Sequence, residues 1–279
     1  MNIIKLAAFS DRYVGGNPAG VVLLSTLPSS EEMQAIARDV GFSETVFAQK
    51  LNNDCHWRIR YFSPESEVAF CGHATIALGA ALANQYGEQT YYLTLNNASI
   101  TVTGSSDSIH ASAALQSPPT HHSLLSDEEV DATLELFGYH KDQLSSTIAP
   151  ARIHGGADHY LIVLESRQDL AMMHYELDKG REFMRSRKLV TVMLAVEASH
   201  NKFHARNAFA SGGVFEDPAT GAAAAAFAGY LRDSRLIQSN GKIEIIQGED
   251  MGARSIISTE FTTDIGSSIT ISGSTRRID

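Results

Sequence analysis

Two short stretches of the sequence resemble each other, and each opens an alanine-rich apolar run. Residues 70–75 are Phe-Cys-Gly-His-Ala-Thr, and residues 215–221 are Phe-Glu-Asp-Pro-Ala-Thr-Gly. Aligning Ala74 with Ala219 gives an offset of 145 residues. Because this spacing is far longer than the period of a solenoid repeat, it indicates two similar halves, each with a helix that begins at the repeated motif. A cleft between two matched domains is a common place for a small-molecule site, and a helix N-terminus favours an anion there.

Length and charge limit the class of protein. A chain of 279 residues is long enough for two domains of ordinary size, each with a core that needs no disulfide or metal. The formal net charge of −10 comes without a basic stripe, so nucleic acid is not an expected partner. The two cysteines, Cys55 and Cys71, form neither a disulfide framework nor a Cys-x-x-Cys pair, which indicates a reducing cytoplasm. No apolar run is long enough to span a bilayer, and Asp11 interrupts the first one before it could form a signal peptide, so we expect no membrane association.

Apolar periodicity and turn residues predict the elements of the first half. Ser29 and Glu32 form a capping-box pattern before a helix that stops at Gly41. The turn-forming residues 15–18 separate the first two strands. The expected strands are 3–9, 21–24, 42–49, 56–62, 91–95 and 100–103, and the first repeated helix is expected at about 72–85.

The second half shows the same mixture of elements. Residues 117–123 have the composition of a linker, so we place the domain boundary after residue 116. We expect residues 265–272 to pair back with the first domain, giving halves of 1–116 (completed by 265–279) and 117–264. The elements expected in the second half are helix 127–137, strand 158–164, a helical region at 167–186, strands 189–196 and 202–209, helix 218–232 and strand 242–247.

The second repeated helix carries the strongest structural information. Residues 222–226 are all alanine, and a helix without a polar face must be buried on every side. Small alanine side chains allow strands to approach such a helix closely. The sequence therefore predicts an α+β fold in which each half wraps a sheet around a central helix.

Polar residues mark both predicted helix starts. Asp217 and Pro218 fit the first positions of a helix, because Asp is a preferred N-cap and Pro suits the first helical turn. The unpaired N–H groups of residues 219–222 would then form an anion site. In the first half, His73 occupies the corresponding place, where the helix dipole favours a neutral imidazole able to donate or accept a proton. A purely structural role, as a cap or as a packed polar side chain, stays open for both residues.

Glu44 is a charged residue between apolar neighbours at the start of a predicted strand. A buried carboxyl group there would be suited to general acid/base catalysis, whereas a solvent-facing glutamate would have no special role. Cys71 is either a base or nucleophile, or a small packed side chain. His200 and His204 have a metal-compatible spacing, but the segment is expected to enter a strand and lacks the Glu of a His-Glu-x-x-His motif, so we expect no metal site. The sequence has no dinucleotide or Walker motif, and we expect no cofactor.

Five motifs in a fixed order then point to a known family. They are Gly-Asn-Pro-Ala-Gly-Val at 16–21, Ser-Glu-Thr-Val-Phe at 43–47, Arg-Tyr-Phe-Ser-Pro at 60–64 followed by Glu67, Cys-Gly-His-Ala-Thr at 71–75, and Glu-Asp-Pro-Ala-Thr-Gly at 216–221. With them the chain resembles the PhzF family of phenazine-biosynthesis-like isomerases. The resemblance implies the diaminopimelate epimerase-like fold, with two pseudo-symmetric halves and the active site in the cleft between them. It also implies isomerisation without a cofactor.

The resemblance also implies roles for single residues. In the family, the glutamate of the Ser-Glu-Thr motif moves a proton on a small cyclic carboxylate, and that residue is Glu44 here. The family's His and Asp that hold and polarise the substrate correspond to His73 and Asp217. The glycine at each helix start contributes backbone contacts. The expected substrate-binding residues are therefore Asn17, Gly72, Thr220, Gly221 and Ala222.

One position departs from the family, and two other functions remain open. The family commonly has Ser after Thr-Gly, but this chain has Ala222, which removes a possible substrate hydrogen bond and argues against the family's phenazine precursor as the substrate. A racemase or epimerase using Cys71 as one base is the first alternative. A non-catalytic protein that binds small carboxylates is the second. A homodimer is expected by analogy with the family.

Overall fold

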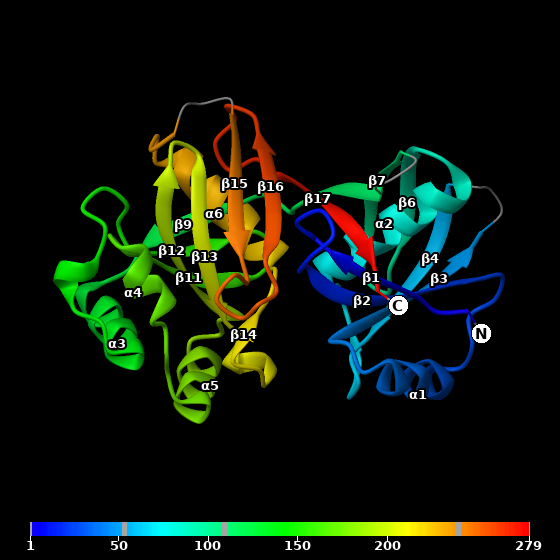
Figure 1. The fold of residues 1–279 in the computed structure, drawn as a ribbon, viewed down its shortest axis with the longest axis horizontal. Coiled ribbons are helices and arrows are strands. Elements are labelled where there is room, and N and C mark those ends of the chain that lie inside the picture. Colours follow the sequence, from blue (N-terminus) through cyan, green and yellow to red (C-terminus); the bar gives the residue numbers. More distant parts are fainter. Residues whose placement is uncertain (1, 52–54, 108–110, 238–240, 279) are drawn as a thin grey trace. The chain divides into compact units, whose positions relative to one another are not determined.

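The computed structural model describes residues 2–51, 55–107, 111–237 and 241–278, and their contacts form two compact units. The first unit comprises Met1–Gln116 and Ser272–Asp279, and the second comprises Ser117–Ile271 (Figure 1). None of the helices in the described ranges is both long enough and apolar enough to cross a membrane.

The first unit is a closed sheet around one helix. Its helices are α1 (Ser30–Val40) and α2 (Gly72–Tyr86). Its strands are β1 (Ile4–Ala8), β2 (Asn17–Leu24), β3 (Glu44–Lys50), β4 (His56–Phe62), β5 (Glu67–Val68), β6 (Gln89–Thr94), β7 (Ser99–Ser106), β8 (Ala111–Gln116) and β17 (Thr270–Arg277). Pairing runs β1–β2–β3–β4–β6–β7–β8–β17 and returns from β17 to β1, which leaves no open edge in this ring.

Helix α2 fills the ring because it has no polar face. Every residue from His73 to Ala83 is buried, and the helix packs against β1, β2, β7 and β8. The two parallel pairs in the ring, β2–β3 and β4–β6, are each joined through a helix, as parallel strands require. Helix α1 provides the first connection and α2 provides the second. These crossovers bring the N-terminal end of α2 close to the start of β3.

Local sequence determines the ends of α1 as predicted. The hydroxyl of Ser29 accepts a hydrogen bond from the Glu32 N–H, and the Glu32 carboxylate accepts one from the Ser29 N–H. Gly41 ends the helix in the left-handed region at φ 71°, where glycine carries no steric penalty. Helix α3 (Asp127–Phe137) in the second unit has the same type of capping box at Ser126 and Glu129.

Two glycines allow α2 to lie directly on β7. A Cβ at Gly79 would stand 2.6 Å from a methyl group of Val102, and a Cβ at Gly104 would collide with the backbone oxygen of Gly79. We therefore expect Gly104→Ala to destabilise the fold by about 1–3 kcal/mol, as overpacking does. Urea denaturation of the variant measures this loss. Thr101→Ala, on the exposed side of the same strand, is the control, and an equal loss in both variants would contradict the explanation.

The second unit repeats this arrangement. Its helices are α3, α4 (Arg167–Ala171), α5 (Leu177–Ser186) and α6 (Gly221–Asp233), with short 3-10 turns at Lys141–Gln143 and Ala210–Gly212. Its strands are β9 (His121–Leu124), β10 (Ala151–His154), β11 (Asp158–Val163), β12 (Thr191–Ser199), β13 (Lys202–Ala208), β14 (Glu216–Asp217), β15 (Gly241–Gln247) and β16 (Ser255–Phe261). Pairing runs β9–β10–β11–β12–β13–β15–β16, with β11–β12 and β13–β15 parallel, and α6 packs against β9, β10, β11 and β16.

A second apolar layer covers the other face of this sheet. Strands β11 and β12 are buried on both sides, which is why they contain nearly continuous apolar runs. Helices α3, α4 and α5 lie on the outer face (Figure 1). Buried residues of that layer include Leu134, Leu170 and Met184 from the helices and Tyr160 and Leu194 from the strands.

The internal duplication is present in the topology, but its register differs from the one the sequence suggested. The unit β4–β5–α2–β6 corresponds to β13–β14–α6–β15, and both central helices begin on a glycine. Gly72 and Gly221 are 149 residues apart, as are the first residues of β5 and β14. The offset of 145 is therefore wrong by four residues, because the matching Ala-Thr pairs occupy different positions relative to the helix starts.

Several element boundaries also differ from prediction. The predicted linker contains β9, and the helical region 167–186 is split into α4 and α5. The last strand begins at Thr270 rather than 265, and residues up to Ile271 belong to the second unit. Asn17 and Pro18 lie in β2 rather than in a turn, a position that Pro tolerates at the beginning of a strand. Strands β8, β10 and β16 were not predicted.

Candidate active site

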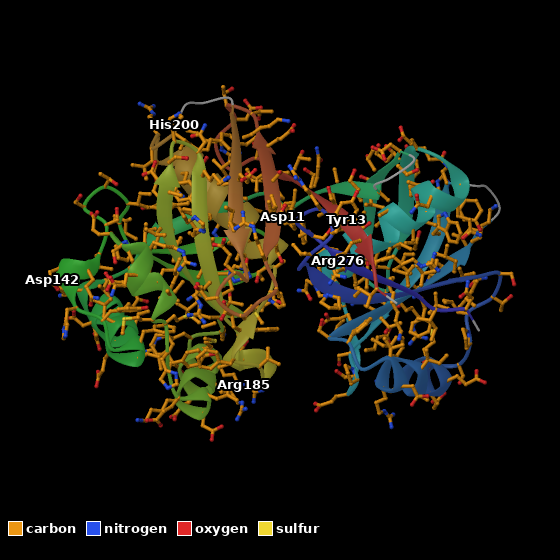
Figure 2. All side chains as sticks on the ribbon, viewed as in Figure 1. Asp11, Tyr13, Asp142, Arg185, His200 and Arg276 are labelled. Atoms are coloured by element: carbon orange, nitrogen blue, oxygen red, sulfur yellow. The ribbon has the colours of Figure 1, made fainter. Side chains whose placement is uncertain are left out.

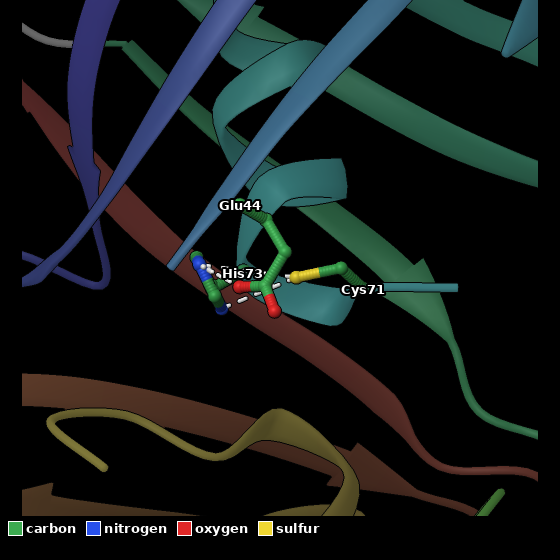
Figure 3. Close-up of side chains that lie close together, drawn as sticks. All are labelled: Glu44, Cys71 and His73. Atoms are coloured by element: carbon green, nitrogen blue, oxygen red, sulfur yellow. Dashed lines mark hydrogen bonds and ion pairs between the residues drawn. The ribbon is translucent and has the colours of Figure 1, made fainter. Parts of the chain in front are cut away.

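Three chemically reactive side chains meet at the N-terminal end of α2. Glu44 is the first residue of β3, Cys71 is the N-cap of α2, and His73 is the second residue of that helix. Their ligand atoms all lie within 4.8 Å of one another (Figure 3). The distance from His73 Nε2 to Glu44 Oε2 is 3.3 Å, and the distance from Cys71 Sγ to His73 Nδ1 is also 3.3 Å. The side chains of His73 and Glu44 are 9% and 19% exposed, so the cluster is nearly buried and open to solvent mainly at the carboxylate.

One arrangement of protons satisfies the whole cluster. In the neutral imidazole of His73, an Nε2–H donates to the Glu44 carboxylate and Nδ1 accepts from the Cys71 thiol. The Ser43 hydroxyl lies 3.3 Å from the same Nε2. His73 therefore lies between a carboxylate and a thiol and can orient both of them.

A buried polar pair supports the backbone under the cluster. The Tyr61 hydroxyl lies 2.7 Å from the Thr75 hydroxyl, which in turn donates to the carbonyl oxygen of Cys71 at 2.7 Å. Burial raises the pKa of Tyr61 well above its ordinary range, so the phenol stays protonated and can donate. These bonds fix the peptide that positions Cys71 and the first turn of α2.

The other predicted residues of the first unit lie nearby. Asn17 is buried in β2, two residues before Ala19, which is the register partner of Glu44. Because side chains alternate along a strand, Asn17 and Ala19 face the same side of the sheet. A Cβ added to Gly72 would meet only the Phe70 ring, at 4.0 Å, so packing does not explain this glycine.

In the second unit, the start of α6 differs from the prediction. Thr220, not Asp217, is the N-cap, and α6 begins at Gly221, so the predicted helix start at Pro218 is wrong. Asp217 lies in β14, opposite Asn207 of β13. Its carboxylate accepts a hydrogen bond from the Thr220 hydroxyl at 2.6 Å. The sheet pairing of Asp217 outweighs the local preference of an Asp-Pro pair for a helix start.

A buried polar network, which the sequence did not predict, holds this segment. The side-chain nitrogen of Gln247 donates to the carbonyl oxygen of Asp217 at 2.6 Å, and its oxygen accepts from the Thr220 N–H at 3.2 Å. That same oxygen accepts from Asn207, which accepts from the Thr191 hydroxyl. The predicted free N–H at Thr220 is thus already bonded. Gln247 is fully buried at the end of β15, and a polar residue closing an apolar strand was the one available sequence clue.

The network ends in a histidine that must stay neutral. The Thr191 hydroxyl donates to Asn207, so it accepts from His159 Nδ1 at 2.7 Å, and the buried His159 Nε2 has no hydrogen-bond partner among the described residues. Burial lowers the pKa of His159 to about 3. The folded protein therefore takes up this proton only in strong acid, whereas the unfolded chain takes it up below about pH 6.5.

This difference predicts acid destabilisation. A histidine with a depressed folded-state pKa contributes full stability above about pH 6.5, and that contribution is lost as the pH falls toward 3. We expect a loss of about 2 kcal/mol between pH 7.5 and pH 5 from this residue. His159→Asn keeps a donor toward Thr191 but does not titrate, so urea midpoints at the two pH values should differ less in the variant. An unchanged pH dependence in His159→Asn would contradict the assignment.

A buried ion pair braces the strand that carries Asp217. Glu216, in β14, accepts from Arg206 of β13 through both carboxylate oxygens, with a shortest distance of 2.5 Å. Arg206 also donates to the carbonyl oxygens of Ala171 and Met173. The corresponding pair in the first unit joins Arg60 of β4 to Glu67 of β5 at 2.6 Å. The repeated Arg–Glu pair fixes the short strand before each central helix.

The two histidines with metal-compatible spacing lie in different elements. His200 lies in the turn between β12 and β13 (Figure 2), and His204 on β13 lies 2.6 Å from the Glu249 carboxylate. Within the described ranges, the cluster of Glu44, Cys71 and His73 is the one group of three such residues with metal-binding spacing.

The first unit also contains a cavity of about 650 Å³ along β1, β17 and the later turns of α2, with Tyr13 and Arg276 in its lining (Figure 2). Its lining includes none of the predicted site residues. The Nε of Arg276 donates to the carbonyl oxygen of Gly15 at 2.8 Å, so this arginine ties the loop between β1 and β2 to β17. The candidate active-site residues therefore lie outside this cavity.

Solved structures share this fold. A PhzF-family protein of Bacillus anthracis superposes with a TM-score of 0.87 at 20% identity, covering 99% of this chain and 96% of that one. A probable proline racemase of Agrobacterium radiobacter superposes with a TM-score of 0.66 at 11% identity, covering 99% and 90%. The fold is thus the mixed α+β, diaminopimelate epimerase-like fold predicted from the sequence, with two pseudo-symmetric halves.

Sequence comparison narrows this fold class to a family. Residues 6–276 match the PhzC-PhzF family of phenazine biosynthesis-like proteins, and the chain belongs to that family. It is 28% identical to an uncharacterized isomerase of Clostridium acetobutylicum, over 94% of this chain and 90% of the relative. It is also 28% identical to the trans-2,3-dihydro-3-hydroxyanthranilate isomerase of Pseudomonas aeruginosa, over 89% and 86%. The protein is an isomerase of this family, as the sequence motifs predicted.

Proposed function

We propose that this isomerase moves a proton between carbon atoms of a small carboxylate, with Glu44 as the general acid/base. The observation that carries the proposal is the state of the Glu44 carboxylate. Among the described residues its ion-pair partner is His73, and it has no lysine or arginine partner, unlike Glu67 and Glu216. A carboxylate that is not committed to a permanent cation can accept a proton and return it.

The uncapped starts of the central helices support an anionic substrate. Helices α1, α3 and α4 are each capped by a serine side chain, at Ser29, Ser126 and Ser166. Helices α2, α5 and α6 have no side-chain cap hydrogen bond, and of these α2 and α6 begin beside the predicted site residues. A substrate carboxylate at such an end would supply the missing acceptor and would gain from the positive end of the helix dipole. The same donors would stabilise negative charge that develops when a carbon loses its proton.

His73 and Asp217 are proposed as the residues that hold and polarise the substrate. His73 can donate to a substrate oxygen once the substrate displaces its contact with Glu44, and its contact with Cys71 Sγ keeps the ring oriented. In the second unit, Asp217 is held by Thr220 and by the bond from Gln247 to its carbonyl oxygen. The backbone at Gly72 and Gly221, together with Asn17, Thr220 and Ala222, completes the proposed substrate-binding set.

The proposed substrate class follows from these groups and from one difference between this chain and the family, at Ala222. The named substrate of the Pseudomonas relative is a hydroxylated anthranilate, which is itself a carboxylate. Ala222 offers no hydroxyl where the family commonly has one. We therefore propose a small cyclic carboxylate whose substituents differ from those of that anthranilate, and no cofactor takes part in the proposed proton transfer.

Deuterium incorporation tests the proposal directly. The protein is incubated in D2O with a panel of cyclic and amino carboxylates, and proton NMR follows the loss of carbon-bound proton signals. Incorporation at two carbon atoms of one compound, coupled to its rearrangement, would support the isomerase. Binding detected by line broadening, with no incorporation for any bound compound, would instead favour a protein that binds carboxylates without catalysis.

The contact between Cys71 and His73 favours one alternative, an epimerase that uses the thiol as a base at a single carbon. Cys71→Ala separates the two reactions. We expect this variant to retain deuterium incorporation to within about tenfold, since the proposed isomerisation requires only Glu44 for proton transfer. Complete loss of incorporation, with the fold intact by circular dichroism, would favour the epimerase.

A further inference from the structure

We propose that Glu44, Cys71 and His73 form a zinc-binding site, and that zinc bound there inhibits the enzyme. The three side chains offer a carboxylate oxygen, a sulfur and an imidazole nitrogen, which are the three kinds of ligand that zinc takes from proteins. Three protein ligands leave the fourth tetrahedral position for water or for a substrate carboxylate. Inhibition rests on the proposed role of Glu44, whereas metal binding does not.

Two of the three distances between the ligand atoms fit a tetrahedral ion, and the third, from Cys71 Sγ to the Glu44 carboxylate, is within 4.8 Å. Zinc–ligand bonds of ordinary length at tetrahedral angles place a sulfur and a nitrogen about 3.6 Å apart, and a nitrogen and an oxygen about 3.4 Å apart. Here Cys71 Sγ is 3.8 Å from His73 Nε2, and that nitrogen is 3.3 Å from Glu44 Oε2. Zinc could therefore enter with small side-chain movements (Figure 3).

Charge balance favours the same ion. Binding would release one proton to the solvent. The Cys71 thiol would pass its proton to His73 Nδ1 and the Nε2 proton would leave, so that a thiolate, the Glu44 carboxylate and a neutral His73 together neutralise the two positive charges of zinc. His73 would bind through Nε2 and exchange its contacts with Glu44 and Ser43 for the metal. No electron transfer is involved, and no other proton leaves the site.

Bound zinc would block the proposed chemistry. The carboxylate of Glu44 could not accept a carbon-bound proton while it coordinates the ion, and His73 would no longer be available to the substrate. Partial exposure of Glu44 gives the ion a route to the cluster from solvent. The proposed zinc is thus an inhibitor and not a resident cofactor.

The chain contains a matched control. Cys55 Sγ lies 3.4 Å from His56 Nδ1, so this pair repeats the thiol–imidazole contact of Cys71 and His73. No Asp or Glu of the described ranges completes a third ligand there. Cys55→Ser and Cys71→Ser therefore make the same chemical change at a two-ligand pair and at a three-ligand cluster.

Cobalt titration of the full-length, metal-free protein tests the site without relying on enzyme activity. Co²⁺ replaces zinc in such sites and gives a sulfur-to-cobalt charge-transfer band in the near ultraviolet. We expect one equivalent to bind, the band to persist in Cys55→Ser and to be absent in Cys71→Ser, and zinc to displace the cobalt. Glu44→Gln should weaken binding at least about tenfold, since even the loss of an indirect supporting group costs that much.

Two results would overturn the proposal. One is the absence of a sulfur-to-cobalt band in the intact protein, and the other is a band that persists in Cys71→Ser but disappears in Cys55→Ser. If cobalt binds as expected, one equivalent of zinc should suppress deuterium incorporation, and a chelator should restore it. Undiminished incorporation with zinc bound would overturn the inhibitory role while leaving the metal site established. Failure of the proposed isomerisation would leave the cobalt spectra unaffected, so the two proposals fail separately.

Discussion

Glu44→Gln should lower the turnover number by about 10²–10⁴-fold, which is the usual contribution of a general acid/base group. The amide has nearly the size of the carboxyl group and can still contact His73, so the first turn of α2 and its uncapped N–H groups should remain in place. Substrate affinity should therefore change little while proton transfer is lost. Deuterium incorporation measures the rate, and ligand line broadening measures binding on the same sample.

The control for this substitution is Glu65→Gln, the same chemical change at an exposed position in the loop before β5. Its turnover should stay within about twofold of the parent, because substitutions away from the site have small effects. Turnover in Glu44→Gln equal to that of the control would exclude Glu44 as the acid/base group. A variant that loses both binding and folding would instead assign a structural role to the residue.

Local sequence predicted the helices well where local chemistry determines them. The capping box at Ser29 and the stop at Gly41 form as expected, and helix 127–137 forms as α3, since the interacting groups are three or four residues apart. The apolar run of α6 predicted a helix buried on all sides, and it is buried from Ala223 to Arg232. These elements were sufficient to predict the fold class.

Contacts between residues distant in the sequence were not predictable in the same way. Gln247 bonds with Thr220 and with the backbone of Asp217 across 27 and 30 residues, and a single polar residue at a strand end does not name its partners. The approach of Glu44 to Cys71 depends on the register between β3 and the strands around α2. Family motifs indicated Glu44 and His73, but the contact of the Cys71 thiol with His73 and the grouping of the three side chains required the structure.

The misplaced start of α6 has a clear physical cause. An Asp-Pro pair favours a helix start when only neighbouring residues are considered. Here Glu216 and Asp217 pair with β13, and Arg206 fixes Glu216 from the same strand. Strand pairing and a buried ion pair together outweigh a cap that is worth about 1 kcal/mol, and the helix begins three residues later, at Gly221.

Breaking the buried ion pair between Arg206 and Glu216 should strongly lower the stability of the protein. Glu216→Gln should destabilise the protein by about 3–5 kcal/mol, because the buried Arg206 guanidinium loses its bidentate counter-charge. The remaining carboxylate near it, that of Asp250, lies 4.0 Å from Nε and is also paired with Arg167. The side chains of Arg206 and Glu216 are only 8% and 3% exposed, so water cannot replace the missing carboxylate. The carbonyl oxygens of Ala171 and Met173, to which Arg206 also donates, carry only partial negative charges. Urea denaturation should show a lower midpoint with an unchanged slope.

An exposed pair in the same unit separates burial from charge. Lys202 and Glu244 lie 2.6 Å apart with about two-fifths of each side chain exposed, and Glu244→Gln should cost no more than about 1 kcal/mol. Equal losses in the two variants would show that burial does not amplify the loss at Glu216. If the charge left on Arg206 is the cause, replacing both partners with apolar residues, as in Arg206→Met with Glu216→Leu, should recover most of the lost stability. Asp217, which is proposed to hold the substrate, follows Glu216 on β14. Ligand binding by the same double variant would show whether the position of Asp217 depends on the Arg206–Glu216 pair or on the bonds from Gln247.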